Sequence, residues 1–394
     1  LSPSSAASDV YKRQAPYAYI NNNYGYSYLW DNVLTYKFEP LRGHKVTLTG
    51  VTSYSHGQSD SNNMRASGQP LDSYLFYNMA SGITKYGVKS NYSQSQKMSY
   101  ALRLNYVYND KYIASFTTRW DGASHLASGH KWESFPAGAL AWRVSQEPFM
   151  ESTKKWLNNL KLRLSYGITG NSGGMGAYSS QTGAATYSPV SIDGVLSSVS
   201  QLVSPYGNPS IGWEKTYQWN YGVDLGFFDG RINLSFDYYD SKTKDLLFSR
   251  TLPVTSAITA WGSPMATWQN IGETSNKGYE IQLSTVNIKS RNFQWSSSIS
   301  YTHNDEKIVN LPDGDLIAKK LFEGHPIKTF YDFKYAGIWS TAEEEEAAKY
   351  GCQPGYVKIE TVEQFTTDEN GNLVGDGGVH TYSTVSYTHL TLPT

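Results

Sequence analysis

Several stabilising or identifying features are scarce in this chain of 394 residues. Cys352 is the single cysteine, which excludes an internal disulfide framework. Charge of neither sign dominates, because 33 Lys and Arg residues stand against 34 Asp and Glu residues. This balance leaves no electrostatic footprint for nucleic acid or an anionic membrane surface. No run of about 18 apolar residues occurs, so the sequence excludes a membrane-spanning helix.

Aromatic residues with a polar tip are abundant instead. Aromatics make up 14% of the chain, with 32 Tyr and 11 Trp but only 14 Phe. Rings of this kind settle where a membrane meets water. The mean hydropathy is −0.49, yet a membrane β-barrel presents only every second side chain to lipid. A low mean hydropathy therefore does not count against such a barrel.

The stretch 213–247 has the pattern of a long hairpin. Apolar and polar residues alternate from Tyr217 to Phe227 and again from Ile232 to Tyr239, which is the period-two pattern of a strand with one apolar face. Asp229 and Gly230 between them favour a tight type I′ turn. Each arm is about a dozen residues long, close to what a tilted strand needs to cross a bilayer. The hairpin predicts a membrane β-barrel.

Similar strands recur along the chain, and short and long connections alternate between them. Strands are expected at 27–38, 45–55, 100–108, 112–120, 135–144, 160–169, 277–286 and 293–303. Long polar loops are expected at 56–93, 121–133, 170–212 and 243–276. Outer-membrane barrels have short turns on the periplasmic side and long loops outside. The polar face would then line the lumen with Lys161, Arg163, Asp224, Asp237, Glu280 and Gln282.

Several motifs resemble the SusC/RagA family of TonB-linked outer-membrane transporters of the Bacteroidota. The match includes R-W-D-G-A-S at 119–124, F-P at 135–136, A-W-R-V-S at 141–145, L-S-Y-G-I-T-G-N at 164–171, W-E-K-T at 213–216 and N-K-G-Y-E-I at 276–281. Ala123 stands where Ser is commoner. The resemblance runs from about residue 28 to 338 and implies an all-β fold, a transmembrane antiparallel barrel of 22 strands, of which this chain supplies ten or eleven.

The resemblance also implies a function and partners. The expected protein is an active importer of oligosaccharides or peptides in the outer membrane, with a plug in its pore. A SusD-like surface lipoprotein would cover the outer loops, and TonB with ExbB and ExbD would drive uptake. Two alternatives share features of the pattern: a passive porin has the same barrel and loop rule, and a secreted glycan-binding β-sandwich has the same alternation and loop aromatics.

Both ends of the sequence differ from the rest. Residues 1–14 and 385–394 resemble translated library-adapter sequence, and we exclude them from fold reasoning. The barrel portion is then expected at 15–384, as an internal fragment of a longer protein.

No pattern in the chain indicates an enzyme, a metal site or a cofactor. The acidic run after Thr341 is typical of a solvated helical turn, with Thr341 and Glu344 at capping-box spacing. The spacing of Asp368, Asn370, Asn372 and Asp376 suggests a calcium loop, but the Gly and the final Glu that such a loop needs are missing. No helical pattern follows the glycines at 173, 174 and 176, as a phosphate cradle would require. Cys352 has no catalytic partner at a recognisable spacing.

Aromatic residues in the expected outer loops are the candidate substrate contacts. Flat rings there could stack on sugars or on apolar peptide side chains, and the alternative is that they pack the loops or belong to the interfacial girdle. The candidates are Tyr178, Tyr187, Tyr206, Trp261 and Trp268.

Overall fold

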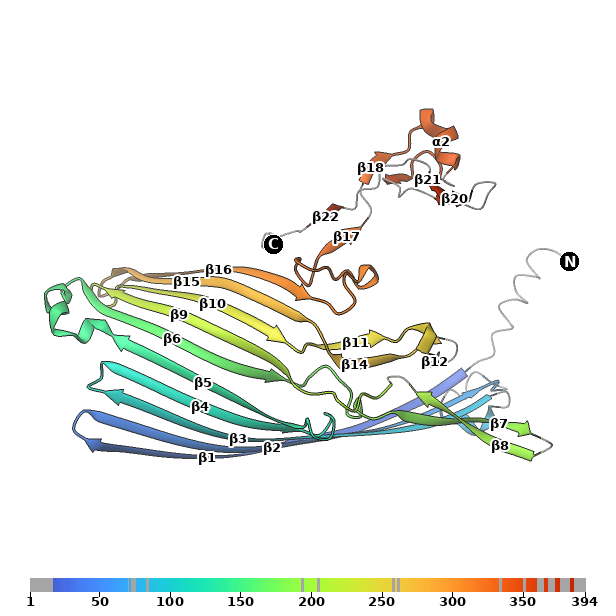
Figure 1. Ribbon diagram of the computed structural model, residues 1–394, viewed down its shortest axis with the longest axis horizontal. Coiled ribbons are helices and arrows are strands. Elements are labelled where there is room, and N and C mark those ends of the chain that lie inside the picture. The colour runs from blue at the N-terminus through green and yellow to red at the C-terminus, as the bar shows by residue number, and fades with distance from the viewer. Residues whose placement is uncertain are drawn as a thin grey trace. The chain divides into compact units, whose positions relative to one another are not determined.

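A ten-stranded antiparallel sheet dominates the computed structural model (Figure 1). The structure describes residues 17–69, 71, 76–82, 85–192, 195–203, 206–256, 259–260, 263–332, 335–349, 352–359, 365–367, 373–375 and 383–385. Among these, the strands of the sheet follow chain order except where loop hairpins intervene. The strands are β1 (Tyr17–Leu41), β2 (His44–Ser67), β3 (Lys85–Tyr108), β4 (Tyr112–Ala123), β5 (Trp132–Arg143), β6 (Leu157–Asn171), β9 (Glu214–Phe227), β10 (Ile232–Lys244), β15 (Glu273–Lys289) and β16 (Gln294–Asn310).

The sheet is an open portion of a barrel wall. In the described residues β1 and β16 are its two edges, and they are not paired with each other. Alternating side chains give each inner strand one apolar and one polar face, as the sequence predicted. The ladders keep these faces aligned, since Leu140 of β5 pairs with Leu164 of β6, which in turn pairs with Tyr221 of β9. The predicted all-β antiparallel barrel portion is confirmed.

The hairpin of β9 and β10 has the predicted turn at its tip. Asp229 and Gly230 have φ angles of 55° and 80°, and the Arg231 amide donates to the Phe228 carbonyl at 3.2 Å. The ladder ends at the pair of Phe227 and Ile232, so the connection contains four residues rather than two, and Phe228 also has a positive φ, of 53°. Gly230 avoids the cost that a Cβ carries in left-handed backbone.

Two expected loops are shorter than predicted, because strands extend into them. The predicted polar loop at 56–93 was wrong at both ends, because β2 continues to Ser67 and β3 begins at Lys85, with Ser67 and Lys85 paired. The reason is physical: beyond the bilayer both faces of a strand meet water, so no apolar alternation marks it. Likewise β4 and β5 continue into the predicted loop at 121–133, up to the pair of Gly122 and Trp132.

The long outer connections carry strands of their own. Segment 170–212 includes the hairpin of β7 (Gly183–Ile192) and β8 (Val195–Val203). Segment 243–276 includes β11 (Leu247–Thr251) paired with β14 (Ala266–Asn270), and β12 (Thr259–Ala260) paired with β13 (Ser263–Pro264). The short helix η2 (Met79–Ser81) lies in the connection between β2 and β3. Helices η3 (Val144–Gln146) and η4 (Pro148–Thr153) lie between β5 and β6, and η5 (Val254–Ser256) lies within segment 243–276.

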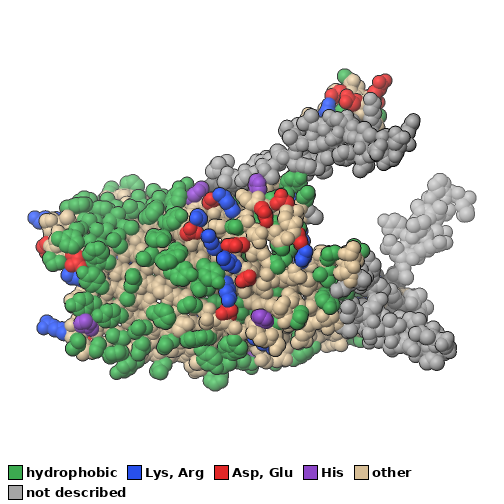
Figure 2. Space-filling model, viewed as in Figure 1, with side chains coloured by type: hydrophobic (Ala, Val, Ile, Leu, Met, Phe, Trp, Pro, Cys, Tyr) green, Lys and Arg blue, Asp and Glu red, His purple; other side chains and the backbone are tan. Residues whose placement is uncertain are grey.

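Short and long connections lie at opposite ends of the sheet, as the alternation predicted (Figure 1). Figure 2 shows hydrophobic side chains covering the part of the sheet towards the short turns, with charged side chains at the turn tips and in a row near the middle of the strands. This distribution matches an apolar band that lies in the membrane near the periplasmic turns, with the outer third of the sheet beyond it.

A second compact unit comprises 272–277 and 304–394, so it takes in the start of β15 and the end of β16. Its elements include η6 (Ile317–Lys319), β17 (Phe330–Asp332), β18 (Tyr335–Ile338), η7 (Thr341–Glu343), α2 (Glu344–Lys349), β19 (Val357–Ile359), β20 (Phe365–Thr367), β21 (Leu373–Gly375) and β22 (Ser383–Val385). No helix among the described residues is long and apolar enough to cross a membrane.

The predicted helical turn is present in this unit, but its capping residue is Ser340 and not Thr341. The Glu343 carboxylate accepts hydrogen bonds from the Ser340 amide at 3.1 Å and hydroxyl at 3.0 Å. Lys358 donates to the same carboxylate at 2.7 Å. These contacts lower the pKa of Glu343 to about 2, with the Lys358 hydrogen bond as the largest cause. The cap is displaced by one residue because Ser340, in extended backbone, directly precedes the first helical residue.

Candidate functional site

The polar face of the sheet carries an ion network around Arg163. Its guanidinium donates two hydrogen bonds to Asp224, both at 2.9 Å, and two to Asp237, at 2.9 and 2.8 Å. Lys161 lies 3.8 Å from Asp224. A Cβ on Gly222, which pairs with Arg163 across the β6–β9 ladder, would come within 2.6–2.8 Å of the guanidinium. The glycine therefore makes room for a neutral, internally satisfied network, which ties three strands together rather than offering a free charge to a ligand.

Two adjoining hollows lie on the same polar face, nearer to the outer loops. One, of about 480 Å³, has a floor of small residues that includes Ser115, Ala139 and Gly167, with Arg103 and Asn220 at its sides. The other, of about 420 Å³, has walls that include Lys97, Arg119, Asp121 and Asn171, with rings of Phe135 and Trp213. Both hollows include Thr117 and Thr169, so they form one trough along the lumen side of the wall. We call this the lumen trough.

The outer hollow of the lumen trough has a net positive charge. Arg119 is paired with Asp121, its Nε lying 2.6 and 2.9 Å from the two carboxylate oxygens. Lys97 has an exposed side chain and no carboxylate within 4.0 Å among the described residues. A solvated ammonium next to hydroxyl and amide groups suits polar or anionic solutes.

A fork in the sheet forms the floor of the outer hollow. The ladder between β5 and β6 runs outward only to the pair of Ala137 and Gly167, although both strands continue beyond it. The Phe135 ring fills the gap, and a Cβ on Gly170 would lie 2.0–2.8 Å from that ring. Phe135 packs edge-on against Trp213, with 5.3 Å between ring centroids. Leu126 and Ala123 complete this small core, and Leu126 is fully buried.

The segment 206–213 joins three outer connections, and we call it the loop junction. Its Tyr206 amide donates to Ala266 at 2.8 Å, and the side chain of Asn208 donates to the Trp268 carbonyl at 2.8 Å. The Trp213 indole donates to the Lys131 carbonyl at 3.0 Å. The Ile211 carbonyl of the loop junction accepts a hydrogen bond from the Ala127 amide at 3.0 Å.

The earlier part of the junction's own connection, 170–212, approaches it at Gly207. A Cβ there would lie 2.2–2.7 Å from the backbone of Gln181 and Thr182, so only glycine allows this approach. Nearby, His125 and the Ser172 carbonyl are hydrogen-bonded at 2.5 Å through Nε2. Burial is the main cause that lowers the pKa of His125. The outer loops are thus fixed to one another by backbone and side-chain hydrogen bonds.

The structure brings together two of the five predicted loop aromatics. Tyr206 forms a bridge to Thr267 of β14, one residue from Trp268, and both aromatic side chains are half-buried. Tyr178 lies in a turn before Gln181 and is 45% exposed. Tyr187 lies in β7, and its side chain is outside the described part of the structure. Trp261 lies outside the described residues.

The motif residues at 119–124 and 141–145 have structural roles that residue spacing alone does not reveal. Gly122 faces the Trp132 ring, which a Cβ would approach to 2.6–2.8 Å. Ser124 and Gln96 exchange two hydrogen bonds of 2.9 Å, which tie the loop to β3. The other motif, 141–145, ends two residues before Glu147.

Glu147 fixes the periplasmic connection between β5 and β6. Its carboxylate accepts hydrogen bonds from the Tyr112 hydroxyl at 2.7 Å, the Trp142 indole at 3.1 Å and the Lys111 ammonium at 3.1 Å. These partners lower the pKa of Glu147, and the Tyr112 hydrogen bond is the largest cause. The cluster cannot be found from spacing because Tyr112 lies 35 residues away.

Other candidate sites from the sequence carry little chemistry here. Among the described residues no group of three or more His, Cys, Asp or Glu is placed to hold a metal ion. Cys352 is half-buried and, as the single cysteine, forms no internal disulfide. The Gly173 amide donates to the Asn171 side chain at 2.8 Å, which closes a turn. The calcium-like residues Asp368, Asn370, Asn372 and Asp376 lie outside the described residues.

An open antiparallel sheet with an apolar outer band, periplasmic short turns and interlocked outer loops defines an outer-membrane β-barrel chain. Residues 2–386 match the family described as TonB dependent receptor-like, beta-barrel, and the chain belongs to this family. Members of this family are outer-membrane proteins, and the sequence prediction of the family and of the membrane is confirmed.

Relatives in sequence and structure agree with this assignment. TonB-dependent receptor P3 of Formosa agariphila is 33% identical over 79% of this chain and 31% of its own length. TonB-dependent receptor SusC of Bacteroides thetaiotaomicron is 32% identical over 76% of this chain and 30% of its own length. The RagAB peptide transporter structure aligns with a TM-score of 0.73, 22% identity and coverage of 93% of this chain and 38% of that one. The chain thus spans about a third of the length of the curated relatives it matches.

Proposed function

We propose that the receptor containing this chain imports oligosaccharides or peptides across the outer membrane, with energy delivered by TonB, ExbB and ExbD. The observation that carries the proposal is the match to SusC over 76% of the chain. The solved relative described as a peptide transporter supports the peptide half of the substrate range. In this proposal the lumen trough forms part of the path along the wall, because its hydroxyl, amide and ammonium groups can replace water around a polar solute.

An uptake assay tests the proposal. The complete receptor, expressed with its neighbouring lipoprotein in a Bacteroidota host, should accumulate labelled oligosaccharides or peptides, and deletion of tonB should abolish accumulation. A passive porin, the competing function, would give uptake that does not depend on tonB. Uptake that persists at full rate without TonB would therefore overturn the importer proposal.

A SusD-like lipoprotein is proposed to cover the outer loops. The loop junction supports this assignment, since it holds three connections together as one surface on which a partner can dock without first ordering them. Affinity purification of the tagged receptor should recover the lipoprotein encoded beside it in stoichiometric amount. Recovery of the receptor alone, under conditions that preserve its fold, would contradict the partnership.

Among the loop aromatics whose side chains the structure describes, we propose Tyr178 as the substrate contact. It is 45% exposed at the outer end, whereas Tyr206 and Trp268 are half-buried in the loop packing. A ring stacked on a sugar or an apolar side chain contributes about 0.5–1.5 kcal/mol, so Tyr178→Ala should raise the half-saturation of uptake by ~2- to 10-fold. Phe149→Ala is the matched control, because Phe149 is a 65% exposed ring in a periplasmic connection. Equal effects of the two substitutions would argue against a substrate role.

A further inference from the structure

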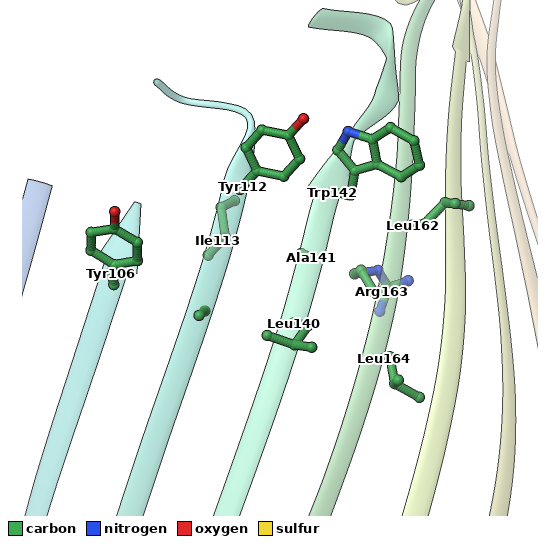
Figure 3. A pocket seen from close by; sticks show the side chains of 10 residues that line it. Tyr106, Tyr112, Ile113, Leu140, Ala141, Trp142, Leu162, Arg163 and Leu164 are labelled. Carbon is green, nitrogen blue, oxygen red and sulfur yellow. The ribbon is translucent and has the colours of Figure 1, made fainter. Parts of the chain in front are cut away.

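An apolar groove lies on the lipid-facing side of the sheet, near the short turns (Figure 3). It has a volume of about 420 Å³, within the range of about 300–1,000 Å³ that ligand pockets occupy. Its lining residues come from the neighbouring strands β3, β4, β5 and β6, and Figure 3 shows their side chains. Those on the lipid-facing parity are Tyr106, Tyr112, Ala114, Leu140, Trp142, Leu162 and Leu164.

Ala114 gives the groove its depth. On the apolar face of β4 it stands between Tyr112 and Phe116, and it pairs with Tyr106 on one neighbouring strand and Leu140 on the other. A methyl group among four large side chains leaves a depression in the wall. A larger aliphatic side chain at this one position would fill it.

The Glu147 cluster holds the groove open at its periplasmic end. The Tyr112 and Trp142 rings are stacked at 6.3 Å with an interplanar angle of 13°. Both rings donate hydrogen bonds to the Glu147 carboxylate, so neither is free to swing over Ala114. The polar tips of such rings mark the level where the bilayer meets water. The groove therefore begins at the periplasmic boundary and continues into the hydrocarbon layer.

We propose that one acyl chain of a phospholipid from the periplasmic leaflet occupies this groove. The occupant follows from the position: the groove is continuous with the apolar band that faces lipid, opens at the interfacial rings, and has an almost wholly apolar surface. A hydrocarbon chain fills such a groove without leaving polar groups unpaired. The fixed rings make the site preformed, which lowers the ordering cost of binding.

The test uses the complete receptor in detergent, titrated with a phospholipid whose acyl chain carries bromine, a quencher of Trp fluorescence. The difference in quenching between the unchanged receptor and the Trp142→Phe variant comes from Trp142. Because Trp142 lines the groove, this difference reports lipid bound there. The difference should saturate, and Ala114→Leu should shift its midpoint at least tenfold to higher lipid concentration. Thr118→Leu, which enlarges a residue on the same face of the same strand outside the groove, should leave the midpoint unchanged.

Retention of heat-modifiable migration shows that each variant is folded. Quenching that rises linearly without saturation, or that Ala114→Leu and Thr118→Leu affect equally, would show contact with bulk lipid or detergent only and would overturn the proposal. Absence of Trp142-dependent quenching in a dimeric receptor would show that a second copy covers the groove, which also overturns it.

Discussion

At the scale of single residues, Glu147 links three partners at the periplasmic end of the wall. Glu147→Gln keeps one acceptor oxygen but loses the ion pair with Lys111, and Glu147→Ala loses every contact. We expect the unfolding temperature, read from heat-modifiable migration, to fall in both variants and further in the Ala variant. Glu151→Gln is the matched control, because Glu151 is 72% exposed and its ion pair is with the neighbouring, exposed Lys154. A fall in the control as large as in Glu147→Gln would contradict the role of the cluster.

A substitution at Gly170 tests how tightly the Phe135 ring packs in the fork between β5 and β6. Since a Cβ there would overlap the Phe135 ring, Gly170→Ala should lower the free energy of unfolding by about 1–3 kcal/mol, the usual cost of overpacking. Phe135→Leu removes the ring, so the double variant should lose less than the sum of the single losses. Denaturant titration of the complete receptor measures these differences. Gly50→Ala is the control, because a Cβ at Gly50 meets no atom within 4 Å, and it should change stability little. Strict additivity of Gly170→Ala and Phe135→Leu would refute the contact between these two residues.

The burial of His125 leads us to expect that the stability of the folded outer loops depends on pH. Burial lowers its pKa below the ordinary 6.5, so the folded loops bind fewer protons than the open loops. The stabilisation is fully present above about 6.5 and is lost as the pH falls towards the lower folded value. Amide exchange of 124–131 and 206–213, corrected for the intrinsic rate, should therefore be faster at pH 5.5 than at pH 7.5. His125→Gln should remove most of this difference, and a difference that persists unchanged would assign it to another group.

At the scale of elements, the outer parts of β2 and β3 make a direct prediction. Because 57–66 pairs with 86–95 in an unbroken ladder, its amides should exchange as slowly as those within the apolar band. Exchange measured by mass spectrometry on the complete receptor checks this. Exchange at 57–66 on the timescale of an unpaired chain would restore the loop that the polar composition suggested.

The elements also show what the sequence could and could not predict. Alternation located the inner strands and the turn at Asp229 and Gly230, because one face had to be apolar and one wet. It failed beyond the bilayer, where both faces are polar and only backbone pairing defines the strand. The fork at Phe135, the loop junction and the Glu147 cluster depend on contacts between residues far apart in sequence, which local patterns do not encode. The loop aromatics remain predicted contacts.

At the scale of the whole molecule, the two edges of the sheet decide how this chain behaves by itself. In the part of the chain that the structure describes, β1 and β16, of 25 and 17 residues, each have one edge without a paired strand. Such edges recruit other strands, and in lipid each unpaired group has no water to compensate it. A complete barrel removes both edges by closing its ladder. The 394-residue chain produced alone should therefore aggregate, or migrate without a heat-modifiable band when refolded in detergent.

The control for this prediction is the complete receptor, refolded under the same conditions, which should give one heat-modifiable and monodisperse species. If the isolated chain also gave a monodisperse product with a cooperative melt, its edges would have to be satisfied by self-association or by folding back. Analytical ultracentrifugation separates these outcomes, because paired edges in a dimer double the mass, whereas closure within one chain does not. A stable monomer would mean that ten strands suffice to close a wall, and the edge argument would fail.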